Sequence, residues 1–219
     1  MNDKQARRYF KVPESCPVVR DWPRTSALLQ PGDIGCSVGS PQSAALFRTV
    51  YGVPYTHTWM ACNPATRIGE ALPQGFVEGD AERYKDSAFA VFRWKGITPA
   101  QQVLLGNTCL EQAEDTISGK PVPYDYGELA WLIMRGMATL AGNILFLFQP
   151  RAAIAARALS WAMGRRNLLD RHGRVICSGK AADISATQGF TLDVKKGFVA
   201  PGHFATSGKL DVILVHPKP

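Results

Sequence analysis

The sequence contains no Cys-x-x-Cys pair, no internal repeat and no low-complexity tract in its 219 residues. Its cysteines are odd in number and widely spaced, which argues against a disulfide framework and against a structural zinc site. The length and the hydrophobic share of 46% suffice for a sizeable core. We therefore expect a single domain, 1–219, whose cysteines lie outside any disulfide framework: Cys16, Cys36, Cys62, Cys109 and Cys177.

The chain also lacks a basic stripe interleaved with aromatic residues, although 25 Lys and Arg against 18 Asp and Glu give it a net charge of +7. This pattern disfavours nucleic acid as a partner and leaves an anionic membrane or cell wall as candidates. The charged N-terminus has no apolar segment behind it, so it does not resemble a Sec signal peptide. We expect a protein made for the cytoplasm of its producer, or one exported by a route that reads no such signal.

Local patterns predict both strands and helices. Prolines at 13, 17 and 23 indicate an irregular segment over 1–25, and 198–204 is expected to be a turn. The predicted helices are 42–50, one that begins at the Thr98-Pro99 capping pair and ends near Gly119, and one from Cys177 to about 187. The predicted strands are a short one after the Pro-Gly-Asp turn at 31–33, then 56–62, 67–72, 89–94 and 210–215.

An unusually apolar stretch follows a predicted turn at 121–127. Residues 129–148 are almost as apolar as a membrane span, but they include Arg135 and Asn143, and a second predicted helix follows over 151–163. Three interpretations are open: a helical hairpin packed on the domain, a pair of helices lying on a membrane surface, or a true span. We treat about 127–170 as a helical insertion into the domain, with a membrane contact through 129–163 as one alternative.

Cys177 stands where a short apolar run, Val175-Ile176, meets small residues and a predicted helix. A cysteine at a helix start lies among free backbone N–H groups at the positive end of the helix dipole, which favours the nucleophilic thiolate. A thiol nucleophile still needs a base, and His57 on the predicted strand 56–62 is the candidate. Because 67–72 forms a hairpin with that strand, Glu70 is the acidic side chain available to orient the imidazole.

The remaining site predictions concern the oxyanion. The backbone N–H of Cys177 is a natural donor to the oxyanion formed on acyl attack, and Tyr124 and Ser178 are further candidates for oxyanion stabilisation or substrate binding. The other histidines, His172, His203 and His216, fall in link, turn and terminal segments and are poorer bases. No metal or other cofactor is expected.

Several of these segments together resemble the circularly permuted NlpC-type papain-like cysteine hydrolases, in which histidine precedes cysteine along the chain. The resemblance covers about Leu28 to Val215 and implies an α+β fold: a permuted papain-like core with an antiparallel sheet. Residue by residue, it implies Cys177 as nucleophile, His57 as base and Glu70 as orienting acid. The segments that carry it are Leu-Gln-Pro-Gly-Asp-Ile at 29–34, Tyr-Thr-His at 55–57, Gly-Glu-Ala at 69–71, Tyr-Asp-Tyr at 124–126, Val-Ile-Cys-Ser at 175–178 and Ala-Pro-Gly-His-Phe at 200–204.

The resemblance leads to three functional hypotheses. The first is a thiol amidase or endopeptidase that acts on peptidoglycan stem peptides, as do effectors delivered into rival bacteria by contact-dependent secretion, with an immunity protein as partner. The second is acyl chemistry on lipids or lipidated proteins, since related permuted members include acyltransferases. The third is a binding module in which Cys177 is only a small core residue.

Overall fold

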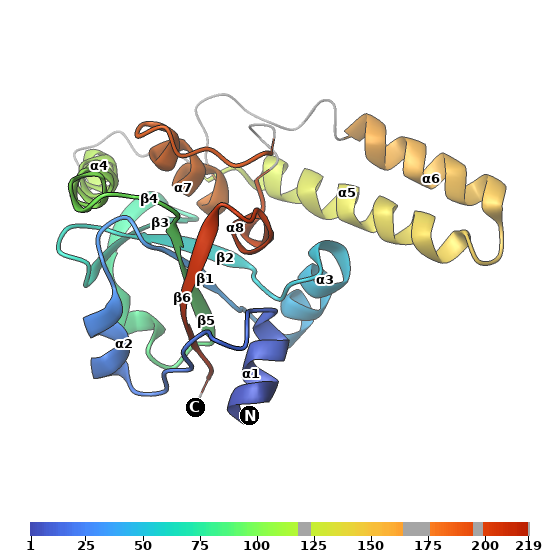
Figure 1. Ribbon diagram of the computed structural model, residues 1–219. Helices are drawn as coiled ribbons and strands as arrows, with labels where there is room; N and C mark the ends of the chain where they lie inside the picture. The colour runs from blue at the N-terminus through green and yellow to red at the C-terminus, as the bar shows by residue number, and fades with distance from the viewer. Residues whose placement is uncertain (118–123, 164–175, 195–198, 219) are drawn as a thin grey trace.

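The fold is that of a computed structural model, which describes residues 1–117, 124–163, 176–194 and 199–218 (Figure 1). These residues form one six-stranded antiparallel sheet, in the order β4-β3-β2-β1-β5-β6, together with eight α-helices. The predicted α+β class with an antiparallel sheet is therefore confirmed. The strands are β1 Ile34–Ser37, β2 His57–Ala61, β3 Arg67–Leu72, β4 Gly75–Asp80, β5 Phe89–Trp94 and β6 Leu210–His216.

Most of the predicted helices are confirmed, with ends that shift by a few residues. The helix predicted to end near Gly119 is described as far as Ile117. The segments 118–123 and 164–175 lie outside the described residues, and with them part of the predicted turn at 121–127 and Val175. The helices are α1 Asp3–Phe10, α2 Trp22–Leu28, α3 Pro41–Tyr51, α4 Pro99–Ile117, α5 Tyr126–Leu145, α6 Pro150–Met163, α7 Cys177–Ala186 and α8 Pro201–Thr206, with a 3-10 turn, η1, at Ala81–Tyr84.

Two predictions about irregular segments were wrong, because short helices there are specified by their caps. In α1, Asn2 and Gln5 form a reciprocal capping box, and in α2 Asp21 caps a first turn that contains Pro23. Proline is tolerated in a first turn, where its missing N–H has no helical partner anyway. The predicted turn at 198–204 likewise contains the start of α8, with Pro201 in its first turn.

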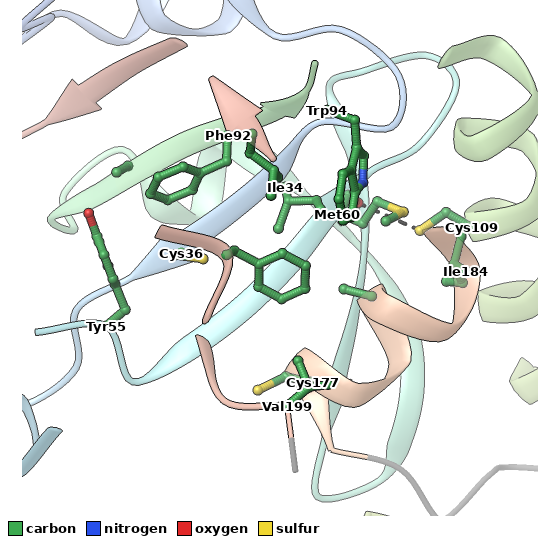
Figure 2. Close-up of a cluster of buried hydrophobic side chains, with 14 of the residues drawn as sticks. Ile34, Cys36, Tyr55, Met60, Phe92, Trp94, Cys109, Cys177, Ile184 and Val199 are labelled. Carbon is green, nitrogen blue, oxygen red and sulfur yellow. Dashed lines mark hydrogen bonds between the residues drawn. The ribbon is translucent and has the colours of Figure 1, made fainter. Parts of the chain in front are cut away.

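Both faces of the sheet are buried. One face packs against α4, α7 and α8 in a cluster that includes Met60, Leu105, Ile184 and Phe204, and Figure 2 shows part of this cluster with Cys177 at its edge. The other face packs against α2 and η1. Side chains alternate along a strand, so β2 supplies Met60 to the first cluster and its neighbours to the second, which includes Trp59, Ala61, Ile68, Phe89 and Leu214.

A buried ion pair at the start of β1 provides a stability test. The Asp33 carboxylate is fully buried and accepts 2.7 Å hydrogen bonds from Nε and Nη2 of Arg93 on β5, and one from the Gln30 backbone. Asp33→Ala is expected to lower the free energy of unfolding by about 3 kcal/mol, because it leaves a largely buried guanidinium without its anion.

Chemical denaturation at pH 7 measures this loss. Asp211→Ala is the matched control. Asp211 lies opposite Arg93 on β6, but its carboxylate is exposed and its ion pair with Lys95 Nζ is long at 3.9 Å. Its removal is expected to change stability by less than about 0.5 kcal/mol. Equal losses in the two variants would contradict the account.

Candidate active site

The structure brings Cys177, His57 and Glu70 together. His57 begins β2, Glu70 lies on the neighbouring strand β3, and Cys177 is the first residue of α7, which packs against β2. His57 Nε2 is 2.9 Å from Glu70 Oε2. The imidazole also interacts with the Cys177 thiol, and Nδ1 is the ring nitrogen that the Glu70 contact leaves for this interaction. The three side chains thus have the arrangement in which a nucleophile, a base and an orienting acid stand in catalytic triads.

Glu70 is held by two residues that the sequence analysis missed. Arg83 Nη1 donates to Oε1 at 2.5 Å, and the Tyr84 hydroxyl donates to Oε2 at 2.6 Å, while the Glu70 side chain is fully buried. Burial alone would raise the pKa of Glu70, but the hydrogen bonds from His57 and Tyr84 and the charges of His57 and Arg83 lower it. Glu70 is therefore a fixed carboxylate that accepts from the imidazole.

Arg83 and Tyr84 reach Glu70 through a strand that was not predicted. The register of β4 against β3 returns the chain beside Glu70, and η1 follows directly. Glycine, aspartate and glutamate make β4 a poor match to a strand pattern. The Pro73-x-Gly75 turn was the available signal, because a turn directly after 67–72 indicates a second hairpin.

The charges on Cys177 and His57 stabilise each other. Burial disfavours both charged forms, but the attraction and hydrogen bond between the two groups outweigh it and raise the pKa of His57 from 6.5 to about 10. Burial likewise opposes the thiolate, yet the His57 charge and backbone hydrogen bonds from Thr58 and Ser178 lower the pKa of Cys177 below 9.0. Both shifts favour the thiolate–imidazolium ion pair over the neutral thiol and imidazole.

The pair lies at the border between core and solvent. Cys177 is 6% exposed and belongs to the hydrophobic cluster of α7, whereas the His57 side chain is 22% exposed. The Cys177 residue is thus nearly covered, whereas the neighbouring imidazole is partly exposed to solvent. Solvent reaches the site on the imidazole side.

The start of α7 supplies backbone donors. Ile176, the N-cap residue, has extended backbone dihedrals and makes no side-chain capping bond. The first amides of α7 are therefore not capped by that side chain and lie at the positive end of the helix dipole. This placement agrees with the predicted role of the Cys177 N–H in binding an oxyanion.

The two further candidates, Ser178 and Tyr124, have different surroundings. The Ser178 side chain is fully buried, and its hydroxyl donates to the Val199 carbonyl at 2.5 Å, so the hydroxyl serves the packing of α7 rather than a substrate. The backbone of Ser178, in contrast, hydrogen-bonds the Cys177 thiolate. Tyr124 is half-buried against the main cluster, with its ring 5.0 Å from that of Tyr126.

The other histidines described have structural partners. His203 Nδ1 accepts from the Ala200 backbone, and burial together with the Arg135 charge lowers its pKa to about 4. His216 is fully buried between the Thr25 hydroxyl and the Lys85 carbonyl. His172 lies outside the described residues. His57 is thus the one described histidine that contacts a cysteine and a carboxylate together.

A comparison with protein-family models finds no match for this chain, and a comparison with curated proteins finds no significant one. The resemblance to permuted NlpC-type hydrolases therefore stays a prediction, and the function has to be argued from the geometry of the site. The described residues contain no group of three or more His, Cys, Asp and Glu suited to hold a metal ion.

A cavity of about 200 Å³ lies elsewhere in the fold, and no triad residue lines it. It is lined by Val50, Tyr51, Arg135, Gly136, Thr139 and His203, from α3, α5 and α8. The thiol and the imidazole that shift each other's pKa are therefore outside this cavity.

Tyr84 is expected to act by positioning Glu70. Tyr84→Phe keeps the ring stacked on Trp59, 5.5 Å between centroids, and removes only the hydroxyl that donates to Glu70. One lost hydrogen bond to a charged acceptor corresponds to a fall in kcat on the order of ten-fold, with little change in KM. Steady-state kinetics on a cleaved substrate measures it.

Tyr55→Phe is the control for that variant, because the Tyr55 hydroxyl also makes one buried hydrogen bond, to the Phe10 carbonyl. It is expected to lose stability but to retain kcat. If both variants lower kcat equally, the Tyr84 hydroxyl has no particular role in the site.

Proposed function

We propose that this protein is a cysteine hydrolase that cleaves amide bonds through Cys177, His57 and Glu70. The observation that carries the proposal is the contact between Cys177 and His57, with the pKa of the thiol lowered and that of the imidazole raised. Structural cysteines in a core are normally protonated and inert. A thiolate at a helix start, paired with an oriented imidazolium, is the arrangement that acyl-transfer chemistry needs.

In the proposed reaction the Cys177 thiolate attacks the amide carbonyl carbon and forms a C–S bond, while the oxygen takes the negative charge beside the Cys177 N–H. His57 donates its proton to the leaving nitrogen as the C–N bond breaks, which gives an acyl-thioester and a free amine. The neutral His57 then takes a proton from water as the water oxygen attacks the thioester. The C–S bond breaks, and a carboxylic acid and the starting ion pair result.

The arrangement of the elements supports a circularly permuted papain-like core. A helix that begins with the cysteine packs on the antiparallel strand that begins with the histidine, and this strand precedes the helix in the chain. The acid comes from the adjacent strand. Along the chain the histidine comes first, then the acid, then the cysteine, and this is the order that the resemblance implies.

For the substrate we propose peptidoglycan stem peptides, with an antibacterial effector as the biological setting and an immunity protein as its partner. The net charge of +7 supports an anionic cell-wall substrate. The test is incubation of the purified protein with muropeptides under reducing conditions, followed by mass spectrometry. We expect products that have gained one water for each bond cleaved.

Two variants make this test specific. Cys177→Ala is expected to give no product, whereas Cys16→Ala, which removes a buried thiol that donates to the Pro17 carbonyl, is expected to keep activity. Absence of product from the wild-type protein, or product from Cys177→Ala, would refute the proposal.

Acyl hydrolysis or acyl transfer on a lipid is the second candidate function. The observation in its favour is the exposed apolar surface of α5 and α6, with side chains such as Leu147 and Phe148 more than three-quarters exposed. Release of fatty acid from phospholipid by the wild-type protein, absent with Cys177→Ala, would select this candidate over the first.

A further inference from the structure

Helices α5 and α6 form a hairpin that projects from the domain (Figure 1). Its base is attached to the domain, because Gly136 packs so closely on Val50 of α3 that a side chain at 136 would overlap it. At the same end the two helices are joined by Trp131 Nε1, which donates to the Met163 carbonyl at 3.0 Å. Beyond Gly136 the helices pack chiefly on each other, with Gly142 against Arg157 and Ala153. The far end of the hairpin is thus presented to the surroundings.

The outward surface of the hairpin is apolar, the reverse of an ordinary surface helix. On α6 the side turned to α5 contains the buried Ala153 and Met163, yet the opposite side also has apolar residues, with Ile154 68% and Trp161 63% exposed. At the connection between the helices, Phe146, Leu147 and Phe148 are 56%, 76% and 77% exposed. Among the described side chains from 130 to 163, the exposed large apolar ones are Met134, Met137, Ile144, Phe146, Leu147, Phe148, Ile154, Leu159 and Trp161.

Beyond Glu128 near the start of α5, the charge of the hairpin has one sign. Residues 129–163 contain Arg135, Arg151 and Arg157 and no Asp or Glu. Arg157 stays close to the tip, with its guanidinium 4.9 Å from the centre of the Phe146 ring. Two copies of the chain that met through this surface would bring like charges together, whereas an anionic surface complements them.

We propose that the hairpin docks the protein on an anionic lipid surface, with 146–148 inserted among the acyl chains and Arg151 and Arg157 beside the phosphates. Exposed aromatic and aliphatic residues with arginines alongside are the combination that binds a membrane interface. None of the helices that the structure describes has the length and the apolar character of a membrane span. The docking does not depend on the chemistry of Cys177.

Vesicle co-sedimentation of the full chain tests this inference. We expect binding to phosphatidylglycerol vesicles that weakens with added NaCl, and much weaker binding to phosphatidylcholine vesicles. The double variant Leu147→Asp/Phe148→Asp is expected to weaken binding on the order of 100-fold, because it removes two inserted side chains and adds negative charge. Arg151→Gln is expected to weaken it about three- to five-fold.

The matched control is Val103→Asp/Leu104→Asp. Val103 and Leu104 are 43% and 46% exposed on α4, away from the hairpin, and the variant makes the same change in charge (Figure 1). We expect binding within about three-fold of the wild type. Unchanged melting temperatures ensure that the variants are folded.

Three results would overturn the inference. The first is no preference of the wild type for anionic vesicles, and the second is an equal loss of binding in the two double variants. The third is a wild-type protein that binds no vesicles but forms a dimer by light scattering, with the dimer lost only in Leu147→Asp/Phe148→Asp. Cys177→Ala is expected to bind vesicles like the wild type. Loss of catalysis and loss of docking are therefore separate outcomes.

Discussion

At pH 7, iodoacetamide is expected to alkylate Cys177 at least about 100-fold faster than Cys16, Cys36 or Cys109. Burial raises the pKa of Cys16 to about 11, which leaves roughly one thiol in 10,000 ionised at pH 7. Burial also raises the pKa of Cys36 and Cys109, whereas the pKa of Cys177 is lowered. The gain in thiolate outweighs the lower intrinsic nucleophilicity of a low-pKa thiolate.

Mass spectrometry of peptides after timed alkylation gives the individual rates. The Cys177 rate is expected to level off at a lower pH than the Cys16 rate, because a thiol gains about ten-fold per pH unit below its pKa and the pKa of Cys16 is raised. The same experiment in urea is the control, because unfolding removes the ion pair and the cysteines then react at similar rates. A Cys177 in the folded protein that reacts no faster than Cys16 would remove the basis of the hydrolase proposal.

Glu70→Gln is expected to lower kcat on the order of 100-fold and to raise the pKa of Cys177. A glutamine has nearly the shape of glutamate but lacks the charge that stabilises the imidazolium and fixes its orientation, and comparable changes in catalytic triads cost 10²- to 10⁴-fold. Without the carboxylate the pKa of His57 falls, and with it the attraction that keeps Cys177 ionised. The thiolate then forms at higher pH.

Two measurements test this prediction, kcat on a cleaved substrate and the pH dependence of Cys177 alkylation, which requires no substrate. Glu78→Gln is the matched control: Glu78 lies one strand away on β4, opposite Gly69, and pairs with Arg67 instead of the triad. We expect it to leave both quantities within about two-fold of the wild type. Equal effects in the two variants would mean that Glu70 does not act on His57.

Much of the local structure could be predicted from the sequence. The strands at 67–72 and 89–94 have the predicted ends, and α7 begins at the predicted Cys177. The hairpin of β2 and β3 was predicted from two adjacent strand-like runs. The hydrogen bond between His57 and Glu70 confirms the prediction that the hairpin brings Glu70 to the imidazole. These features succeed because a turn and its flanking periodicity lie within one short window.

The wrong or missed predictions have two causes. Helices α1 and α2 are short, and caps and packing rather than long periodic patterns specify them. The contribution of Tyr84 depends on the course of β4, which brings it back to Glu70 across the hairpin of β3 and β4. The spacing of residue types along the chain does not indicate the contact between Tyr84 and Glu70.

The sequence by itself determined which residue types were available for the chemistry and where local structure would hold them: a cysteine opening a helix, and a histidine and a glutamate on adjoining strands. Only the tertiary structure decided that α7 lies against β2, so that Cys177 meets His57, and that Arg83 and Tyr84 close around Glu70. The physical reason is that charge depends on distance and burial. The same thiol is inert or ionised according to whether an imidazolium stands beside it, and that proximity is set by the packing of segments far apart in the chain.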